Sequence, residues 1–522
     1  MKRAFIQNNI AFAVLVALLI ICLAAICLVN FYAYPQWYDS DMYLDILYAS
    51  KAWKEKSIFP ENWIFGNQFY VVSTPVIAAL FCAFWEPQTA MAAASVTVSL
   101  LIVGSFLWML MPATKSKEAC LAGTIFLIAS VLYFGDAHRD YNGWQLMFTM
   151  CSYYGVYAVN AFLAFGCYLR AKLLGRKSVM LILAITCLLS FGTGMQSLRQ
   201  TAIMTCPMIG MEILRWIYCR VRKYPLDRKP MIVVGAVSLS NILGLVVIRM
   251  MDIPRVGLKA VWAVPSFSEI LSSVLENLKL AYKVFGLGGK FQLGFFWLMV
   301  ALCLITVVGI FIRLVRRQEG NALALLILFG IGVAAVFVAG ILAILRVRMI
   351  YYFMLFPMMA FLMACAYADL GKWGKGLVLT SLLLMIGLSW SDFYRDVFVP
   401  IQNRENNVYI QAADYLVENG YTTIYSEWDN CGEDVAIASG CRLQAGFWTW
   451  EYAPYEKIQT LCDPSIFSES PEHCVYMFRG MERVKFGIEG AQKCGVELTQ
   501  LAYFPEGDLY LFSAPVNLML LH

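Results

Sequence analysis

Apolar runs of about 20 residues recur along most of this chain, and they constrain its fold more than any other feature. A helix of that length spans roughly 30 Å, which is the thickness of the hydrocarbon core of a bilayer. Of the 522 residues, 60% are hydrophobic and only 14% are charged, so the chain has more apolar surface than a water-soluble core can bury. We therefore expect a polytopic α-helical membrane protein.

Length and apolarity predict about eleven transmembrane helices. They fall at 10–30, 89–111, 119–135, 146–169, 178–194, 200–218, 231–249, 292–313, 321–345, 349–368 and 376–391. One further run, Tyr70–Trp85, is ambiguous, because it would be only about 24 Å long as a helix and it contains Pro75.

Charge resolves the ambiguity, because short cytoplasmic loops carry an excess of Lys and Arg. If Tyr70–Trp85 only dips into the outer interface, every basic cluster falls on the same side as the N-terminal Lys2 and Arg3; if it spans, they all fall outside. The clusters are Lys115/Lys117, Arg170/Lys172/Arg176/Lys177, Arg220/Arg222/Lys223/Arg228/Lys229, Arg313/Arg316/Arg317 and Lys372/Lys375. We therefore expect the N-terminus inside, the C-terminus outside, and a multi-pass protein of the plasma membrane.

This topology divides the chain into a transmembrane domain, residues 1–391, and an extracytoplasmic α/β domain, residues 392–522. Residues 31–88 form a long first external loop with interfacial helices. Within it, apolar residues recur at helical spacing over Asp41–Lys56, which predicts a helix that lies on the membrane with Asp45 and Lys51 away from its apolar face.

Two later segments also have a clear pattern. Ser266–Val284 is a second amphipathic helix candidate, with Ser266 or Ser268 as N-cap. In the C-terminal region, a helical run at Tyr409–Glu418 and alternating runs such as Leu509–Phe512 favour a small α/β fold.

The composition argues against several functions. The net charge of +5 is spread over short clusters between apolar runs, so we expect no nucleic-acid partner. Three histidines give no zinc spacing among the 16 cysteines. The polar C-terminal region holds an odd number of cysteines, of which some could pair, in a connectivity the sequence does not fix: Cys431, Cys441, Cys462, Cys474 and Cys494.

Four polar clusters converge on the outer face in this topology. They are the acidic trio Asp39/Asp41/Asp45, the loop Asp136–Asp140 with His138 and Arg139, the segment Gln196–Gln200 around Arg199, and the pair Arg346/Arg348. Each cluster alone is explained as well by a solvated loop or an interfacial anchor. Together they supply carboxylates and guanidinium groups on one face of the bilayer.

That combination suits group transfer from a lipid phosphate. A positioned carboxylate can take the proton of an acceptor hydroxyl, and arginine grips phosphate oxygens in a bidentate manner. The catalytic candidates are Asp39, Asp41, Asp136 and Asp140, and the substrate-binding candidates include His138, Arg139, Arg199, Arg346 and Arg348. Oxygen ligands suit Mg²⁺ or Mn²⁺, so Asp39, Asp41 and Asp140 are the metal candidates, although nothing in their spacing requires a metal.

Short motifs in this layout resemble the polyprenyl-phosphate-dependent GT-C glycosyltransferases, including the protein O-mannosyltransferases and the aminoarabinose transferases. They are Asp39-Ser40-Asp41-Met42-Tyr43-Leu44 in the first external loop, Pro60, the Pro75-led apolar run, and Arg348 to Pro357, which contains Tyr351. The resemblance implies that Asp39, with Asp41 close behind, is the catalytic base, and that Asp136 or Asp140 is a second external acid. Ser73 and Thr74 stand where the aminoarabinose transferases have a Lys.

The expected function is therefore that of an inverting membrane glycosyltransferase. It would transfer a sugar from a polyprenyl-phosphate donor to a lipid, glycan or protein acceptor on the extracytoplasmic side. Three alternatives remain open: a lipid-linked sugar flippase or other transporter, a polysaccharide polymerase or ligase, and a non-enzymatic scaffold or sensor. A transporter predicts ionisable groups near the middle of the spans, where this chain has few.

Overall fold

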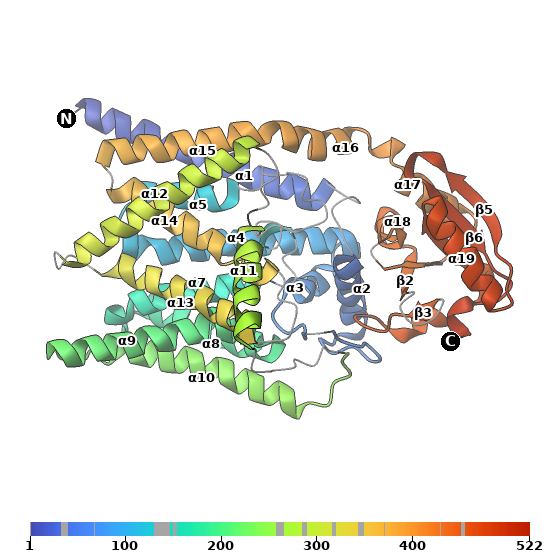
Figure 1. Cartoon of the computed structure of the whole chain (residues 1–522), viewed down its shortest axis with the longest axis horizontal. Helices are drawn as coiled ribbons and strands as arrows, with labels where there is room; N and C mark the ends of the chain where they lie inside the picture. The colour runs from blue at the N-terminus through green and yellow to red at the C-terminus, as the bar shows by residue number, and fades with distance from the viewer. Residues whose placement is uncertain are drawn as a thin grey trace.

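The protein has two parts, a bundle of long helices and a small mixed sheet with helices packed on it (Figure 1). The computed structural model describes residues 2–32, 40–66, 68–129, 147–149, 154–256, 266–283, 285, 290–315, 320–342, 349–369, 371–428, 430–449 and 455–521.

Six helices in these ranges are long and apolar enough to cross a membrane. The helices of the bundle are α1 (Lys2–Tyr32), α4 (Pro87–Thr114), α5 (Lys117–Ala129), α7 (Gly155–Leu169), α8 (Lys177–Gln196), α9 (Cys206–Arg222), α10 (Lys229–Met250), α12 (Lys290–Val315), α13 (Asn321–Leu342), α14 (Leu355–Asp369) and α15 (Gly371–Phe393). The six are α1, α4, α8, α10, α12 and α13, whereas α7 and α14 are apolar but shorter. The number eleven stays a prediction.

The ambiguous run Tyr70–Trp85 does not form a crossing helix. Its only helix is α3 (Thr74–Phe81), whose eight residues would span about 12 Å. Pro75 stands at the start of α3, where its missing N–H has no helical partner to lose. The short helix agrees with the prediction that this run does not cross, and its place at the outer interface stays a prediction.

The described residues of the basic clusters share one end of the bundle, as predicted, whereas Arg316 and Arg317 lie outside the described residues. Lys375 pairs with Glu118 at 3.2 Å, and Arg313 pairs with Asp369 at 2.5 Å. At the same end, Lys229 Nζ donates to the carbonyl oxygen of Lys172. This basic end also holds the N-terminus, and the C-terminal sheet lies beyond the opposite, domain-facing end (Figure 1).

Two amphipathic helices lie at the domain-facing end. Helix α11 (Phe267–Lys283) runs across the direction of the long helices (Figure 1), and Ser266 caps it: the Glu269 carboxylate accepts from the Ser266 backbone N–H at 2.7 Å, and Ser266 Oγ accepts from the Glu269 N–H. This confirms Ser266 as the N-cap.

The second amphipathic helix, α2 (Ser40–Glu55), confirms the predicted segment but not its surroundings. It packs against α3 and α4 on one side and the C-terminal region on the other, and its position on a membrane surface stays a prediction. As a result Asp45, predicted to avoid the apolar face, is buried, with 1% of its surface exposed.

The C-terminal region forms a six-stranded mixed sheet in the order β3-β2-β1-β4-β6-β5. Strands β2, β1 and β4 are parallel, and the outer strands are antiparallel to their neighbours. The strands are β1 (Thr423–Glu427), β2 (Gln444–Thr449), β3 (Glu456–Lys457), β4 (Cys474–Arg479), β5 (Thr499–Phe504) and β6 (Leu509–Ser513), and the main helices are α17 (Val408–Glu418), α18 (Gly432–Ala438) and α19 (Met481–Lys493). The five cysteines of this region are all free thiols.

One apolar core joins this sheet to the first loop. It runs from Tyr43 and Tyr48 of α2, through Phe65 and Tyr70, to Trp448 of β2. The C-terminal region is thus packed directly on the segment between α2 and α3, which also touches the end of α8. This contact positions the site described next.

Candidate functional site

Arg199 is the centre of the most unusual polar arrangement at the domain-facing end. It follows the last residue of α8 by three positions and opens the helix that η3 (Thr201–Thr205) and α9 continue. Its guanidinium donates to Gln68 Oε1 at 2.5 Å and lies 5.4 Å from the ring centroid of Tyr154 and 5.6 Å from that of Tyr351. Four segments that are far apart in sequence therefore meet at one cation.

No carboxylate among the described residues lies within ion-pair distance of Arg199. Burial lowers the pKa of Arg199, but the hydroxyls of Tyr154, Tyr157 and Tyr351 raise it, and the net shift is upward. The guanidinium is therefore charged at every physiological pH. A partly buried cation that has aromatic and amide neighbours, but no counter-charge in the described part of the chain, is suited to an anionic ligand, and its planar fork matches a phosphate.

A second set of hydrogen bonds fixes the groups around the guanidinium. The hydroxyl of Tyr157 lies 2.9 Å from Ser197 Oγ and also donates to Gln68 Oε1 at 3.4 Å. Ser197 Oγ accepts in turn from the backbone N–H of Arg199. Gln68 is only 4% exposed, so its amide oxygen serves the arginine and the tyrosine rather than water.

The first loop is held against α8 by Gln196, the last residue of that helix. Gln196 Oε1 accepts from the backbone N–H groups of Val71, at 3.1 Å, and Val72, at 2.6 Å. The two segments approach so closely at Gly192 that a Cβ there would lie 2.2 Å from Val72 Cγ2. Gln68 is consequently presented to Arg199 by a rigid stretch of backbone.

Tyr351 reaches the site from η4 (Met349–Tyr352), which α11 supports. The Tyr352 hydroxyl donates to Asn277 Oδ1 at 2.5 Å, and Asn277 is 3% exposed. Asn277 lies on α11, so this helix helps to fix the turn that carries Tyr351.

Helix α2 brings the first-loop acids to the same end of the bundle. Asp41 is in its first turn and partly buried, and Asp45 follows one turn later. The Tyr48 hydroxyl donates to the carbonyl oxygen of Ile58 at 2.7 Å and to that of Tyr70 at 3.4 Å. The pKa of Tyr48 is raised mainly by burial and to a smaller extent by the nearby Asp45. The acids of α2 and the Gln68–Val72 segment thus belong to one packed unit.

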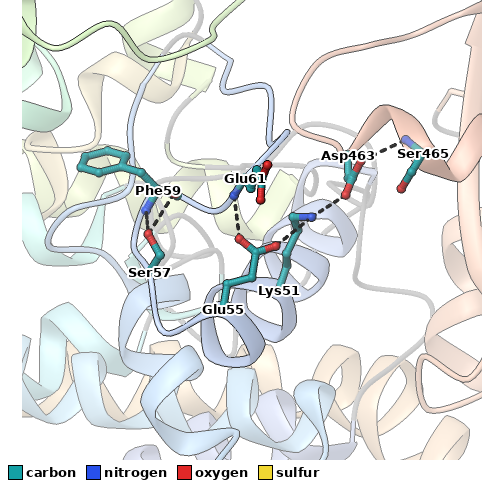
Figure 2. A network of polar contacts seen from close by, with 7 residues as sticks. All are labelled: Lys51, Glu55, Ser57, Phe59, Glu61, Asp463 and Ser465. Carbon is teal, nitrogen blue, oxygen red and sulfur yellow. Dashed lines mark hydrogen bonds and ion pairs between the residues drawn. The ribbon is translucent and has the colours of Figure 1, made fainter.

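The C-terminal region clamps this unit from the other side (Figure 2). Lys51 Nζ lies 2.5 Å from Asp463 Oδ2 and 3.0 Å from Glu55 Oε1, and Glu55 accepts from the Glu61 N–H. Tyr43 Oη accepts from the buried N–H of Ala445 at 2.7 Å. Lys51, predicted to lie away from the apolar face of this helix, forms part of the contact with the C-terminal region.

Of the residues predicted for the site, the structure brings Arg199 and Tyr351 together. Asp39, Asp136, His138, Arg139, Asp140, Arg346 and Arg348 lie outside the described residues. Sequence reasoning missed Gln68, Tyr154 and Tyr157, because an amide and two tyrosines next to apolar runs have no distinguishing pattern. Within the described part of the chain, no three His, Cys, Asp or Glu side chains gather into a metal-binding group.

Comparison with known proteins finds similarity in solved structures alone. No family model and no curated protein matches the sequence. Two crystal structures of ArnT from Cupriavidus metallidurans match, one in the apo state and one bound to undecaprenyl phosphate. The chain is similar to ArnT. The apo match covers 99% of both chains at 12% identity with a TM-score of 0.49, and the second covers 97% of this chain and 98% of the ArnT chain at 11% identity with a TM-score of 0.49.

Proposed function

We propose that the protein is a membrane glycosyltransferase that moves a sugar from a polyprenyl-phosphate donor to an acceptor on the extracytoplasmic side. The observation that supports it most directly is Arg199, a partly buried guanidinium without a counter-charge among the described residues. Arg199 follows the end of α8, at the domain-facing end of an apolar bundle, and this place suits a phosphate that is carried on a lipid. The first-loop motif around Asp39 and Asp41, which resembles that of GT-C enzymes, supplies the acids.

In the proposed reaction a carboxylate of Asp39 or Asp41 takes the proton of the acceptor hydroxyl. The acceptor oxygen forms a bond to the anomeric carbon while the bond from that carbon to the phosphate oxygen breaks, which inverts the anomeric configuration. The bonding electrons leave with the polyprenyl phosphate. Arg199, with Arg346 and Arg348, would stabilise the negative charge that develops on this leaving group.

A transporter of lipid-linked sugars is the main alternative, and the polar groups inside the bundle favour it less. The buried network of α7, α8 and α10 is built from neutral side chains, chiefly Asn160, Ser190 and Asn241. Glu212, an acid within α9, forms an ion pair with Arg215, with 2.6 Å between Glu212 Oε2 and Arg215 Nη2. Proton- or ion-coupled transport relies on ionisable groups near the midplane.

The proposal is tested with purified protein in detergent and a panel of polyprenyl-phosphate sugars. Wild type should consume one donor, and native mass spectrometry should show undecaprenyl phosphate bound. Arg199→Ala should weaken that binding by about tenfold or more, since it removes a charge-assisted contact. The double variant Asp39→Asn/Asp41→Asn should still bind the lipid but lose transfer.

Full transfer activity in the Asp39→Asn/Asp41→Asn protein would show that neither carboxylate is the catalytic base. Unchanged lipid binding by Arg199→Ala would mean that Arg199 does not bind the phosphate. Arg215→Ala provides a matched control, because that arginine is paired with Glu212 and donates to the Asp227 carbonyl oxygen, so its guanidinium is used within the protein. It should leave lipid binding unchanged.

A further inference from the structure

A π-helical turn, η3, lies directly after Arg199. It covers Thr201–Thr205 and is followed without interruption by α9. A π turn is rare, because it inserts one residue into the regular helical ladder, and it changes the direction in which the preceding side chains leave the helix. Such a turn persists only where neighbouring groups hold it.

Asn241 of α10 is the group that holds this turn. Its Oδ1 accepts from Thr201 Oγ1 at 2.8 Å and from Thr205 Oγ1 at 3.1 Å, so both ends of η3 meet one oxygen. Its Nδ2 donates to the carbonyl oxygen of Ser190 in α8 at 3.2 Å. Asn241 is fully buried, and one amide thus joins α8, η3 and α10.

Close packing of α8 on α10 keeps this amide in place. A Cβ at Gly194 would lie 2.2 Å from the Asn241 carbonyl oxygen, and a Cβ at Gly244 would lie 2.0 Å from that of Phe191. The contact extends toward α7, since Asn160 Nδ2 donates to Ser190 Oγ. The amide therefore has little freedom to follow a change in η3.

Packing alone does not require the hydrogen bonds of Asn241 with Thr201 and Thr205. Valine is close in size to threonine, and an apolar residue at 241 with valines at 201 and 205 would avoid burying polar groups at this depth. The retained polar contacts select one helical register for the turn that begins at Arg199. Register selection is a well-attested use of a buried asparagine.

We propose that Asn241 is a positioning residue for the anion site: through Thr201 and Thr205 it fixes the π turn that aims Arg199 at Gln68, Tyr154 and Tyr351. The inference rests on the proposed function, because it assigns Arg199 to a lipid phosphate. Neither Asn241 nor the two threonines contacts the guanidinium, so their effect on binding runs through backbone geometry.

The test compares undecaprenyl phosphate binding, by native mass spectrometry, in wild type, Thr201→Val/Thr205→Val, Arg199→Ala and the triple combination. The double variant should bind about tenfold more weakly than wild type, and the same two changes should have no further effect in the Arg199→Ala protein. Thr186→Val is the matched control: Thr186 is buried, as Thr205 is, and its hydroxyl donates to the Ile182 carbonyl oxygen within α8, away from η3. It should bind as wild type.

Several outcomes overturn the inference. Wild-type affinity in Thr201→Val/Thr205→Val does so, as does an equal loss with and without Arg199, which would indicate a general structural defect. If Arg199→Ala binds normally, the phosphate site of the proposed function is wrong, and the inference falls with it. Should the double variant fail to fold, Thr201→Val and Thr205→Val alone are each expected to weaken binding and carry the same comparison.

Discussion

Asp434 is a carboxyl group buried in the C-terminal region, where α18 packs on α17. Burial raises its pKa to about 8 from an ordinary value of 3.8, while nearby Arg479 and a hydrogen bond with Tyr409 lower it in part. Between about pH 4 and pH 8, the folded protein therefore keeps a proton that the unfolded chain has already released. The stabilisation from this proton is complete below pH 4 and is lost as the pH rises through 8.

Asp434→Asn should remove this dependence, because an amide stays neutral at every pH. We expect the Tm of the full-length protein in detergent to fall between pH 5 and pH 9 by a few degrees more in wild type than in Asp434→Asn. Asp414→Asn is the control, because Asp414 is exposed on the same face of the domain as its partner Arg442, 3.9 Å away. Parallel Tm curves for wild type and Asp434→Asn would contradict the assigned pKa.

Some residues of the candidate site could be predicted from the sequence, and others could not. Arg199 was a candidate because its segment, with the other polar clusters, falls on one face of the bilayer in the predicted topology, although alone it could be an interfacial anchor. Gln68 and Asn241 were not, because an amide acquires its role from partners 131 and 40 positions away. Asp45 was misplaced for a related reason: the sequence shows one apolar face of α2, but this helix packs against other segments on more than one side and is buried nearly all round.

At the scale of the helices, α8 and α10 form the closest contact near the site. Gly244→Ala puts a Cβ 2.0 Å from the Phe191 carbonyl oxygen, so the two helices must separate. Overpacking of this kind costs about 1–3 kcal/mol. We expect Gly244→Ala to lower the Tm by several degrees and to weaken undecaprenyl phosphate binding, because Asn241 moves with α10.

Gly235→Ala is the matched control on the same helix, since a Cβ there meets nothing within 4 Å. It should be neutral or slightly stabilising, because alanine favours a helix over glycine. If both variants have the same Tm, the close approach of α8 and α10 does not contribute to stability.

The elements themselves were partly predictable. The run Tyr70–Trp85, which charge bias predicted not to cross, contains only the short helix α3, and one of the two predicted caps, Ser266, directly precedes α11. The π turn after Arg199 could not be predicted from the sequence, because Thr-Ala-Ile-Met-Thr is compatible with an ordinary α-helix. Tertiary hydrogen bonds from α10 decide it.

At the scale of the whole molecule, the C-terminal region and the first loop behave as one body. Sequence composition divides them, since a polar stretch follows the last apolar run. The structure joins them by a shared core, by the backbone bond from the Ile64 N–H to the Cys462 carbonyl oxygen at 2.9 Å, and by Lys51–Asp463. Helix α2, which carries Asp41, is therefore held in place by the C-terminal region.

The Lys51–Asp463 pair should contribute to this attachment, because each side chain is only 22% exposed. Lys51→Glu sets three carboxylates together, with Glu55 and Asp463, so we expect faster amide exchange at 456–468 and 59–66 in the full-length protein. Asp463→Lys alone should act similarly, whereas the exchanged pair Lys51→Glu/Asp463→Lys should recover much of the protection. Asp369→Lys breaks an ion pair of similar exposure at the basic end and should leave both segments unchanged. Failure of the exchanged pair to recover protection would mean that the apolar core alone attaches the domain.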